Sequence, residues 1–121
     1  KDGLFFNAEG KEGEVVRGTE KLTPVRWMAY TASADGKPVT VALFDHPDNP
    51  RHPAHMFTMT GGFAYMSATL NLWKEKLEIA AGKPLVLRYG VALWDGKAEP
   101  RQIEALYQRW LTTAAGSARR G

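Results

Sequence analysis

The pattern of apolar and polar positions predicts a chain built mostly from short strands. Residues 25–33 alternate between two faces, and residues 39–43 do the same. Asp35-Gly36 lies between the two stretches and favours a tight hairpin turn, because glycine tolerates a positive φ angle. We therefore predict an antiparallel hairpin. Its first strand carries Val25, Trp27 and Ala29 on one face, and its second strand carries Val39, Val41 and Leu43.

Other strands are predicted on both sides of this hairpin. Residues 9–23 are rich in Gly, Lys and Glu without a clear period, so they indicate a loop with at most a brief strand at Val15-Val16. Apolar and β-branched stretches predict the remaining short strands. These are expected at residues 4–6, 55–60, 63–72 and 77–79, with Gly61-Gly62 as the turn between the 55–60 and 63–72 strands.

Residues 85–93 show a clean two-residue period, which predicts a strand with one buried face. That face carries Leu85, Leu87, Tyr89, Val91 and Leu93. Arg88 and Trp94 fall on the opposite, less apolar face, where they suit either a carbohydrate or acidic ligand or cation–π packing against another domain. Asp95-Gly96 marks the end of the strand.

The last part of the chain changes to a helical period. Pro100 suits the first turn of a helix, where its missing N–H costs nothing. The apolar stripe that follows consists of Ile103, Leu106, Tyr107, Trp110 and Leu111. We expect a helix at residues 100–112 that stops before Gly116, with residues 113–121 as a disordered tail. The expected fold class is mainly β, an antiparallel β-sandwich domain at residues 1–112 that includes one C-terminal α-helix.

Composition narrows the possible functions. The 121 residues include no cysteine, so disulfides and thiolate chemistry are excluded, and a metal site would need His, Asp or Glu. The formal charge of +3 includes Arg119 and Arg120, so the body is close to neutral, which is a poor basis for nucleic-acid binding. No apolar run approaches the ~20 residues that span a bilayer. The compartment is left open.

One polar run, from Asp45 to His52, holds most of the side chains suited to chemistry. Prolines at positions 47, 50 and 53 recur every third residue, and each fixes φ at about −65°, so the run should be stiff, extended and left-handed. This predicts imidazole, amide and guanidinium groups that point outward at the rim of the sheet. A period of three places His46, Asn49, His52 and His55 on one edge, and Asp45, Asp48 and Arg51 on another.

The histidines of this run make a poor metal site. A polyproline segment rises ~3.1 Å per residue, so side chains three residues apart are separated by ~9 Å, whereas zinc ligands lie only ~2.0–2.1 Å from the ion. We therefore expect no metal and no cofactor. A purely structural corner explains the Asp, Asn and Pro residues, because these types favour turns. It explains two histidines and an arginine less well.

The functional interpretation is a polar ligand site on this loop. If the protein is an enzyme, the sequence offers His46 or His52 as the acid/base residue, and Arg51 and Arg88 as electrostatic clamps. The candidate ligand-binding residues are Asp45, Asn49, Arg51, Arg88 and Trp94. The rival interpretation is a non-catalytic interaction module, in which the run is a structural corner. The sequence leaves open whether the protein is an enzyme.

The run also resembles a known family, the bacterial PmoA-like family of unknown function, which is also labelled methane oxygenase PmoA. The similar segments are residues 44–53, Arg26-Trp27 with Tyr30, and Arg88-Tyr89-x-Val91 leading into Asp95-Gly96. The resemblance as a whole covers most of residues 3–112. After residues 44–53 the family tends to have Pro-Trp, where this chain has His55-Met56.

The resemblance implies a β-sandwich protein, extracytoplasmic or cytoplasmic, that takes part in carbohydrate catabolism, and it supplies no catalytic residues. A methane monooxygenase subunit spans a membrane, which does not fit a chain without a long apolar run. Members are typically much longer, so this chain is similar to their C-terminal half. We therefore expect a carbohydrate-like ligand, and a missing N-terminal half or a second copy as partner, because a half-sandwich exposes sheet edges.

Overall fold

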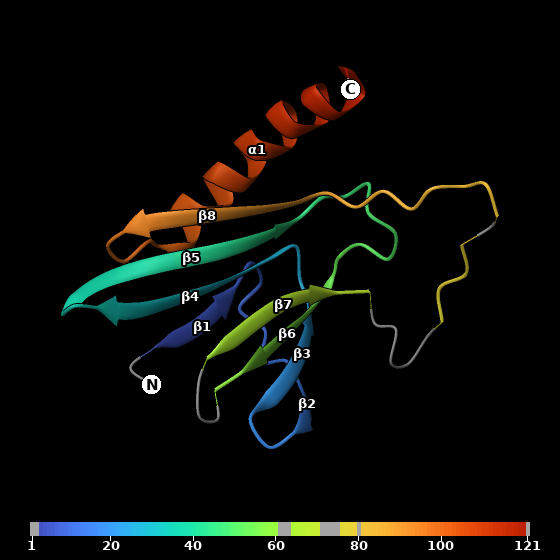
Figure 1. The fold of residues 1–121 in the computed structure, drawn as a ribbon. Coiled ribbons are helices and arrows are strands. Elements are labelled where there is room, and N and C mark those ends of the chain that lie inside the picture. Colours follow the sequence, from blue (N-terminus) through green and yellow to red (C-terminus); the bar gives the residue numbers. More distant parts are fainter. Residues whose placement is uncertain (1–2, 61–63, 71–75, 80, 121) are drawn as a thin grey trace.

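The computed structural model describes residues 3–60, 64–70, 76–79 and 81–120, which form eight strands and one helix (Figure 1). In chain order the elements are β1 (Leu4–Asn7), β2 (Glu14–Arg17), β3 (Glu20–Pro24), β4 (Trp27–Ala34), β5 (Lys37–Asp45), β6 (His55–Met59), β7 (Tyr65–Thr69), β8 (Tyr89–Asp95) and α1 (Pro100–Arg120).

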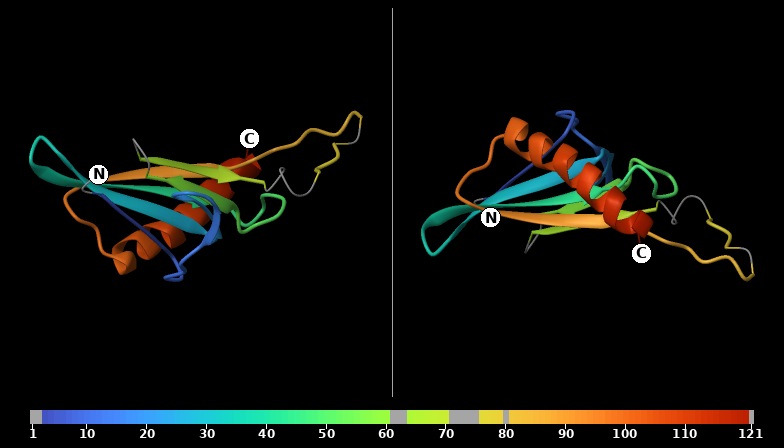
Figure 2. Two further views of the ribbon diagram at one scale, coloured as in Figure 1. Left: turned by 90° about the horizontal axis from the view of Figure 1, so that it is seen from below. Right: turned by 90° about the horizontal axis from the view of Figure 1, so that it is seen from above.

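The strands form two antiparallel sheets. The first sheet has the strand order β1-β4-β5-β8, and the second has the order β2-β3-β6-β7. The helix α1 lies across one face of the first sheet, and the second sheet packs against the other face (Figure 1, Figure 2). The structure therefore confirms a mostly β, sandwich-like fold with one C-terminal helix.

The hairpin of β4 and β5 forms as predicted. Its turn is Asp35-Gly36, where the two residues have positive φ angles of 53° and 78°. Two successive positive φ angles match the right-handed twist of the flanking strands. The strands then pair in continuous register as far as Trp27 opposite Phe44, so this hairpin forms the centre of the first sheet.

One core lies between α1 and the first sheet. Its buried residues are Trp27, Ala29, Ala42, Phe44, Ala98, Ile103 and Tyr107. Within it, the indole Nε1 of Trp27 donates a hydrogen bond to Oε1 of Glu104 at 2.7 Å. Burial alone would raise the pKa of Glu104, but hydrogen bonds from Gln108 and Trp27 and the nearby Arg26 guanidinium outweigh burial and lower that pKa. The helix thus buries its predicted apolar stripe and also holds a charged contact at the edge of the core.

The helix is longer than predicted. The sequence suggested a stop before Gly116 and a disordered tail, whereas α1 runs to Arg120. Glycine inside a helix costs only ~1 kcal/mol relative to alanine, and alanines and arginines, which favour helices, stand on both sides of Gly116. A single glycine is therefore a weak stop signal.

A second core lies between the two sheets, and its buried residues are Val25, Met28, Ala54 and Met56. The prediction that Val25 shares a face with Trp27 is wrong, because β4 begins only at Trp27 and strict alternation starts there. The N–H of Val25 instead donates to the carbonyl of Ala54 at 3.2 Å. This bond ties the chain just before β4 to the chain just before β6.

Three of the other predicted strands are present and two segments differ. The predictions for residues 4–6, 55–60 and 63–72 correspond to β1, β6 and β7. Residues 9–23 contain a hairpin in which β2 includes the brief strand predicted at Val15-Val16, whereas β3 was not predicted. β2 is exposed along its whole length, so its sequence carries no burial period. Residues 77–79 form no strand, and the predicted Gly61-Gly62 turn lies outside the described residues.

β8 differs most from the prediction. It covers Tyr89–Asp95 instead of residues 85–93. Val91 and Leu93, which the two-residue period placed on a buried face, are 67% and 78% exposed. The predicted period exists in the sequence, but no described part of the chain covers the face that it marks.

The opposite face of β8 packs against the helix. Ala92 and Trp94 contact the helix core. A Cβ atom on Gly90 would lie only 2.9 Å from the ring of Trp110. The face with the small residues is therefore the one that lets the helix approach closely, and it fixes which side of β8 is buried.

Candidate functional site

The polar run forms a compact corner between the two sheets. We call residues 45–54 the corner, because they carry the chain from the last residue of β5 in the first sheet to the start of β6 in the second (Figure 1). The predicted extended geometry is wrong, since residues 47–53 form turns and bends and Arg51 has a φ angle of 62°. Each proline fixes φ only at its own position, so the residues between the prolines can still turn.

Asp45 accepts the central hydrogen bonds of the corner. Its side chain is 1% exposed. Oδ1 accepts from Nδ2 of Asn49 at 2.7 Å. Oδ2 accepts from the N–H of Ala54 at 2.7 Å and lies 2.5 Å from Nδ1 of His52. Because a carboxylate that accepts on both oxygens has no proton to give, Nδ1 of His52 is the donor of that pair. Asp45, which the sequence suggested as a ligand-binding residue, is turned inward, and both of its oxygens are paired within the protein.

Asn49 joins the corner to the start of β8. Its buried side chain donates from Nδ2 to the carbonyl of Arg88 and accepts at Oδ1 from the N–H of Arg88, both at 2.7 Å. The same carbonyl accepts from the N–H of His46 at 3.3 Å. The side-chain amide of Asn49 thus makes the two backbone hydrogen bonds that a residue of a neighbouring strand would make. This use of both polar atoms makes Asn49 a structural residue in the corner.

His46 is enclosed on the helix side. It is 3% exposed. Nδ1 accepts from the N–H of Asp48 at 3.1 Å, and Nε2 is buried without a hydrogen-bond partner among the described residues. The ring meets Trp110 edge-on, with 5.5 Å between the ring centroids. In this arrangement no nitrogen of His46 can reach a solvent-borne ligand.

Arg51 anchors the corner to the chain that follows β7. Nη1 donates to the carbonyl of Leu70 at 2.7 Å, and Nη2 donates to the carbonyl of Lys76. The guanidinium that the sequence suggested as a ligand clamp is therefore engaged with backbone oxygens. Its positive φ angle and these two bonds together shape the outer turn of the corner.

The structure divides the candidate residues between the two faces of the first sheet. Asp45 and His52 lie toward the second sheet, since the residue before Asp45 packs on the helix and successive side chains alternate. His46 and Trp94 lie toward the helix. Arg88 has the same parity as Trp94 along the strand. The structure thus brings Asp45, Asn49 and His52 together, while His46 and Trp94 belong to the other face.

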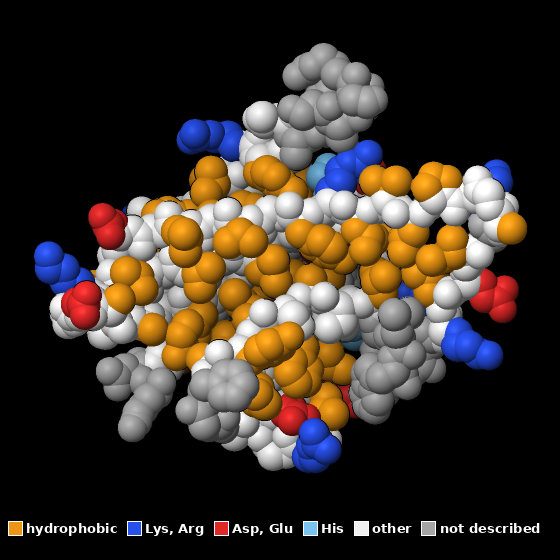
Figure 3. Space-filling model, viewed as in Figure 1, with side chains coloured by type: hydrophobic (Ala, Val, Ile, Leu, Met, Phe, Trp, Pro, Cys, Tyr) orange, Lys and Arg blue, Asp and Glu red, His pale blue; other side chains and the backbone are white. Residues whose placement is uncertain are grey.

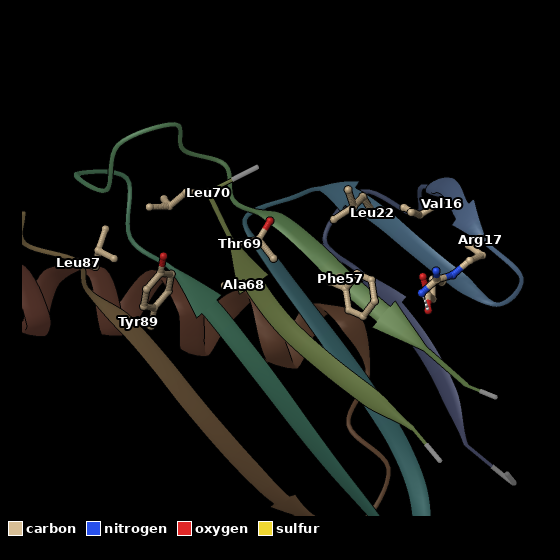
Figure 4. Close-up of a pocket in the computed structure, with 10 residues that line it drawn as sticks. Val16, Arg17, Leu22, Phe57, Ala68, Thr69, Leu70, Leu87 and Tyr89 are labelled. Carbon is tan, nitrogen blue, oxygen red and sulfur yellow. Dashed lines mark hydrogen bonds and ion pairs between the residues drawn. The ribbon is translucent and has the colours of Figure 1, made fainter. Parts of the chain in front are cut away.

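A groove on the sandwich side lies next to the corner, and its volume is about 810 Å³ (Figure 4). Cavities of this size hold small organic ligands. The apolar lining is mainly Leu22, Phe57, Ala68, Leu70 and Leu87. The ion pair of Arg17 and Glu20 lies at one end, and Thr69 and Tyr89 lie toward the other (Figure 4). The corner adjoins that second end, because Tyr89 pairs with Asp45 and Thr69 pairs with His55.

Tyr89 is a groove residue that the sequence reasoning assigned only to a buried strand face. Burial first, and then the negative charge of Asp45, raise the pKa of its phenol. The hydroxyl therefore stays protonated at neutral pH and can donate a hydrogen bond. A signal was present in the sequence, since Tyr89 is the one residue with a polar tip in an otherwise aliphatic period.

Two further features bear on the site. Among the residues that the structure describes, no three His, Cys, Asp or Glu side chains come together as metal ligands would. In the same part of the chain, no helix combines the length and apolar character needed to cross a membrane.

Comparison with known proteins gives one match. No curated protein and no solved structure matches the chain. The comparisons give no support to the PmoA-like label that residues 44–53 suggested. A family model does match residues 1–108, which is most of the chain, and the chain therefore belongs to that family, a family of unknown function (DUF6807).

Proposed function

We propose that the chain binds a sugar or a related polyol in the groove beside the corner, and that His52 exchanges a proton with a hydroxyl group of this ligand. The pair of Asp45 and His52 carries the proposal. Nδ1 of His52 lies 2.5 Å from a carboxylate oxygen of Asp45, while the side chains of the two residues are 23% and 1% exposed. A buried carboxylate therefore holds a partly exposed imidazole.

The pair has the geometry that general acid/base catalysis requires. Asp45 receives the Nδ1 proton and so fixes the tautomer and the orientation of the ring, as the carboxylate does in known Asp–His pairs. Nε2 of His52 is then an acceptor, and the side chain of His52 is 23% exposed, whereas that of His46 is 4% exposed. A hydroxyl group that reaches Nε2 can give up its proton there and take it back.

The groove supports a carbohydrate-like ligand. A sugar has apolar C–H faces that pack against aromatic rings and hydroxyl edges that need hydrogen bonds. Phe57 offers a ring in the groove, and Tyr89 offers a phenol hydroxyl at the end of the groove near the corner (Figure 4). The similarity of residues 44–53 to the PmoA-like family, with its part in carbohydrate catabolism, favours the same class of ligand.

The test is a ligand screen with matched variants. We expect at least one sugar or polyol from a panel of D-glucose, D-galactose, D-xylose, D-mannitol and myo-inositol to raise the Tm of the wild type, because bound ligand stabilises the folded state. His52→Ala and Tyr89→Phe should weaken this ligand's binding, and the imidazole signals of His52 should shift in nuclear magnetic resonance spectra. Asp48→Ala is the control, since its carboxylate is 64% exposed and lies near His46 instead of the pair of Asp45 and His52.

A second candidate function has its own observation. Asp45, Asn49 and Arg51 all bond to backbone groups, as expected of a structural corner in a non-catalytic interaction module. If the screen raises no melting temperature and His52→Ala only lowers the Tm, this second function replaces the first. Arg51→Ala cannot discriminate, because loss of its two carbonyl contacts destabilises the corner under either function.

A further inference from the structure

β8 is an edge strand, and no strand among the described residues pairs with its outer side. It lies at the end of the first sheet, beyond β5. The N–H and the carbonyl of Arg88 both bond toward the corner. Because successive residues of a strand point their backbone groups to opposite sides, Tyr89, Val91 and Leu93 direct theirs to the free edge. The same three residues belong to the face that the helix leaves uncovered.

The exposed apolar surface continues from β8 into the segment before it. Leu85, Val86 and Leu87 are 39%, 54% and 37% exposed, beside the still more exposed Val91 and Leu93. Figure 3 shows hydrophobic side chains in a band across this face of the molecule. A patch of large apolar residues on one face is typical of a contact surface. The two-residue period of residues 85–93 thus begins before β8, in residues 85–88, which form no strand in the structure.

We propose that two copies of this chain associate through residues 85–93, which pair antiparallel across a twofold axis at Tyr89 and join the two first sheets into one. In this register the apolar residues of one copy lie opposite the apolar residues of the other. Leu87 stands opposite Val91 of the second copy, and Leu85 stands opposite Leu93. Pro84 has the other parity, so its missing N–H faces away from the new pairing and costs nothing there.

The charges also fit a second copy. The register that centres on Tyr89 places Lys83 opposite Asp95 of the second copy, and symmetry forms this pair twice. Arg88 stands opposite Gly90, so no like charges meet directly across the pairing. A register shifted by two residues in either direction loses the pairing of Lys83 with Asp95.

One of the two edge strands of the second sheet, β2, offers a useful contrast. β2 carries Glu14 and Arg17, and its register is irregular between Val15 and Arg17. Charges and irregularities of this kind discourage edge-to-edge pairing. β8 has neither between Tyr89 and Trp94, which leaves its edge ready to accept a strand.

The first experiment measures the mass of the 121-residue chain by sedimentation over about 1–100 μM protein, the range in which a moderate self-association shows. We expect a concentration-dependent dimer. Val91→Lys should weaken dimerisation by about tenfold or more, since it places a charge in the apolar contact. Leu4→Lys is the matched control, because Leu4 is 62% exposed on β1, the opposite edge of the same sheet, and it should leave the dimer intact.

The second experiment tests the register with cysteine, which the chain lacks. In Tyr89→Cys the two new residues face each other at about 5.5 Å between Cα atoms, within the range of a disulfide. In Val91→Cys they are about 13 Å apart or more, because a strand rises ~3.3 Å per residue. Oxidation should therefore cross-link the first variant and not the second.

Three results would overturn the proposal. These are a wild-type chain that stays monomeric throughout the concentration range, equal loss of the dimer in Leu4→Lys and Val91→Lys, and cross-linking of Val91→Cys without cross-linking of Tyr89→Cys. Neither the sedimentation mass nor the cross-linking depends on a ligand or on His52. The dimer and the proposed function are therefore tested separately.

Discussion

The corner and β8 are neighbours in the fold, but they place polar and apolar groups in opposite ways. The corner buries Asp45 and Asn49 and pairs every polar atom of their side chains. β8 exposes Val91 and Leu93 and leaves backbone groups at its edge free of a neighbouring strand. The contrast shows that the partners available to a side chain decide whether it is buried. A polar group can be buried wherever backbone groups meet it, and an apolar group stays exposed until another surface covers it.

The largest effect that we expect from breaking this contrast comes from Asp45→Ala. The change removes the acceptor of Asn49, His52 and Ala54, and leaves buried donors unpaired. The free energy of unfolding should fall by about 3 kcal/mol, because buried donors lose the charged acceptor that they share. Urea denaturation measures it. Asp48→Ala, at an exposed carboxylate of the same corner, should change the value by less than about 0.5 kcal/mol.

The next effect concerns the link between the two regions. Asn49→Ala removes both hydrogen bonds to the backbone of Arg88 and should cost about 2 kcal/mol of unfolding free energy. Asn49→Asp should cost more at neutral pH, because it sets a second carboxylate against Asp45 and against the carbonyl of Arg88. Denaturation curves at neutral and acidic pH separate the two variants. Equal costs at both pH values would contradict the assigned contacts.

A smaller effect is expected at the contact between the helix and the corner. The hydroxyl of Tyr107 donates to the carbonyl of Asp45 at 2.8 Å, so Tyr107→Phe should cost about 1 kcal/mol. Burial first, and then the charge of Asp45, raise the pKa of Tyr107 to about 12. Between pH 10.0 and about 12 the unfolded chain has lost this proton while the folded chain keeps it, so stability falls as pH rises through that window.

Thermal melts at increasing pH test this sign. Between pH 10.0 and about 12, the Tm of Tyr107→Phe should fall less steeply with pH than the Tm of the wild type. Tyr89, whose pKa is also raised, leaves a residual dependence in that variant.

The smallest effect is expected at β8. Leu93→Thr replaces the most exposed of the large apolar side chains of the strand with a β-branched polar one. For dilute, monomeric protein, the free energy of unfolding should change by less than about 0.5 kcal/mol. Chemical denaturation at low protein concentration measures it. A loss as large as that of Asn49→Ala would mean that the first sheet buries this face within one chain.

The sequence predicted the elements that depend on local rules. Asp35-Gly36 located the central hairpin through its turn chemistry, and the apolar stripe from Ile103 onward located the helix. The corner escaped prediction because proline spacing reports single φ angles, whereas its shape depends on Arg51 at positive φ and on backbone partners remote in sequence. His52 was identified as a candidate, but its pairing with Asp45 depends on turns that the spacing does not encode.

The bond between Val25 and Ala54 has a consequence for how the molecule opens. The chain leaves the second sheet after β3 and returns to it at β6, which pairs with β3. The bond between Val25 and Ala54 therefore closes the base of the central hairpin that lies between these two strands. Two backbone N–H groups hold this base together. The N–H of Val25 donates to the carbonyl of Ala54, and the N–H of Ala54 donates to the carboxylate of Asp45. Amide hydrogen exchange at Val25 and Ala54 therefore reports the separation of the two sheets from each other, which we expect to occur before either sheet unfolds.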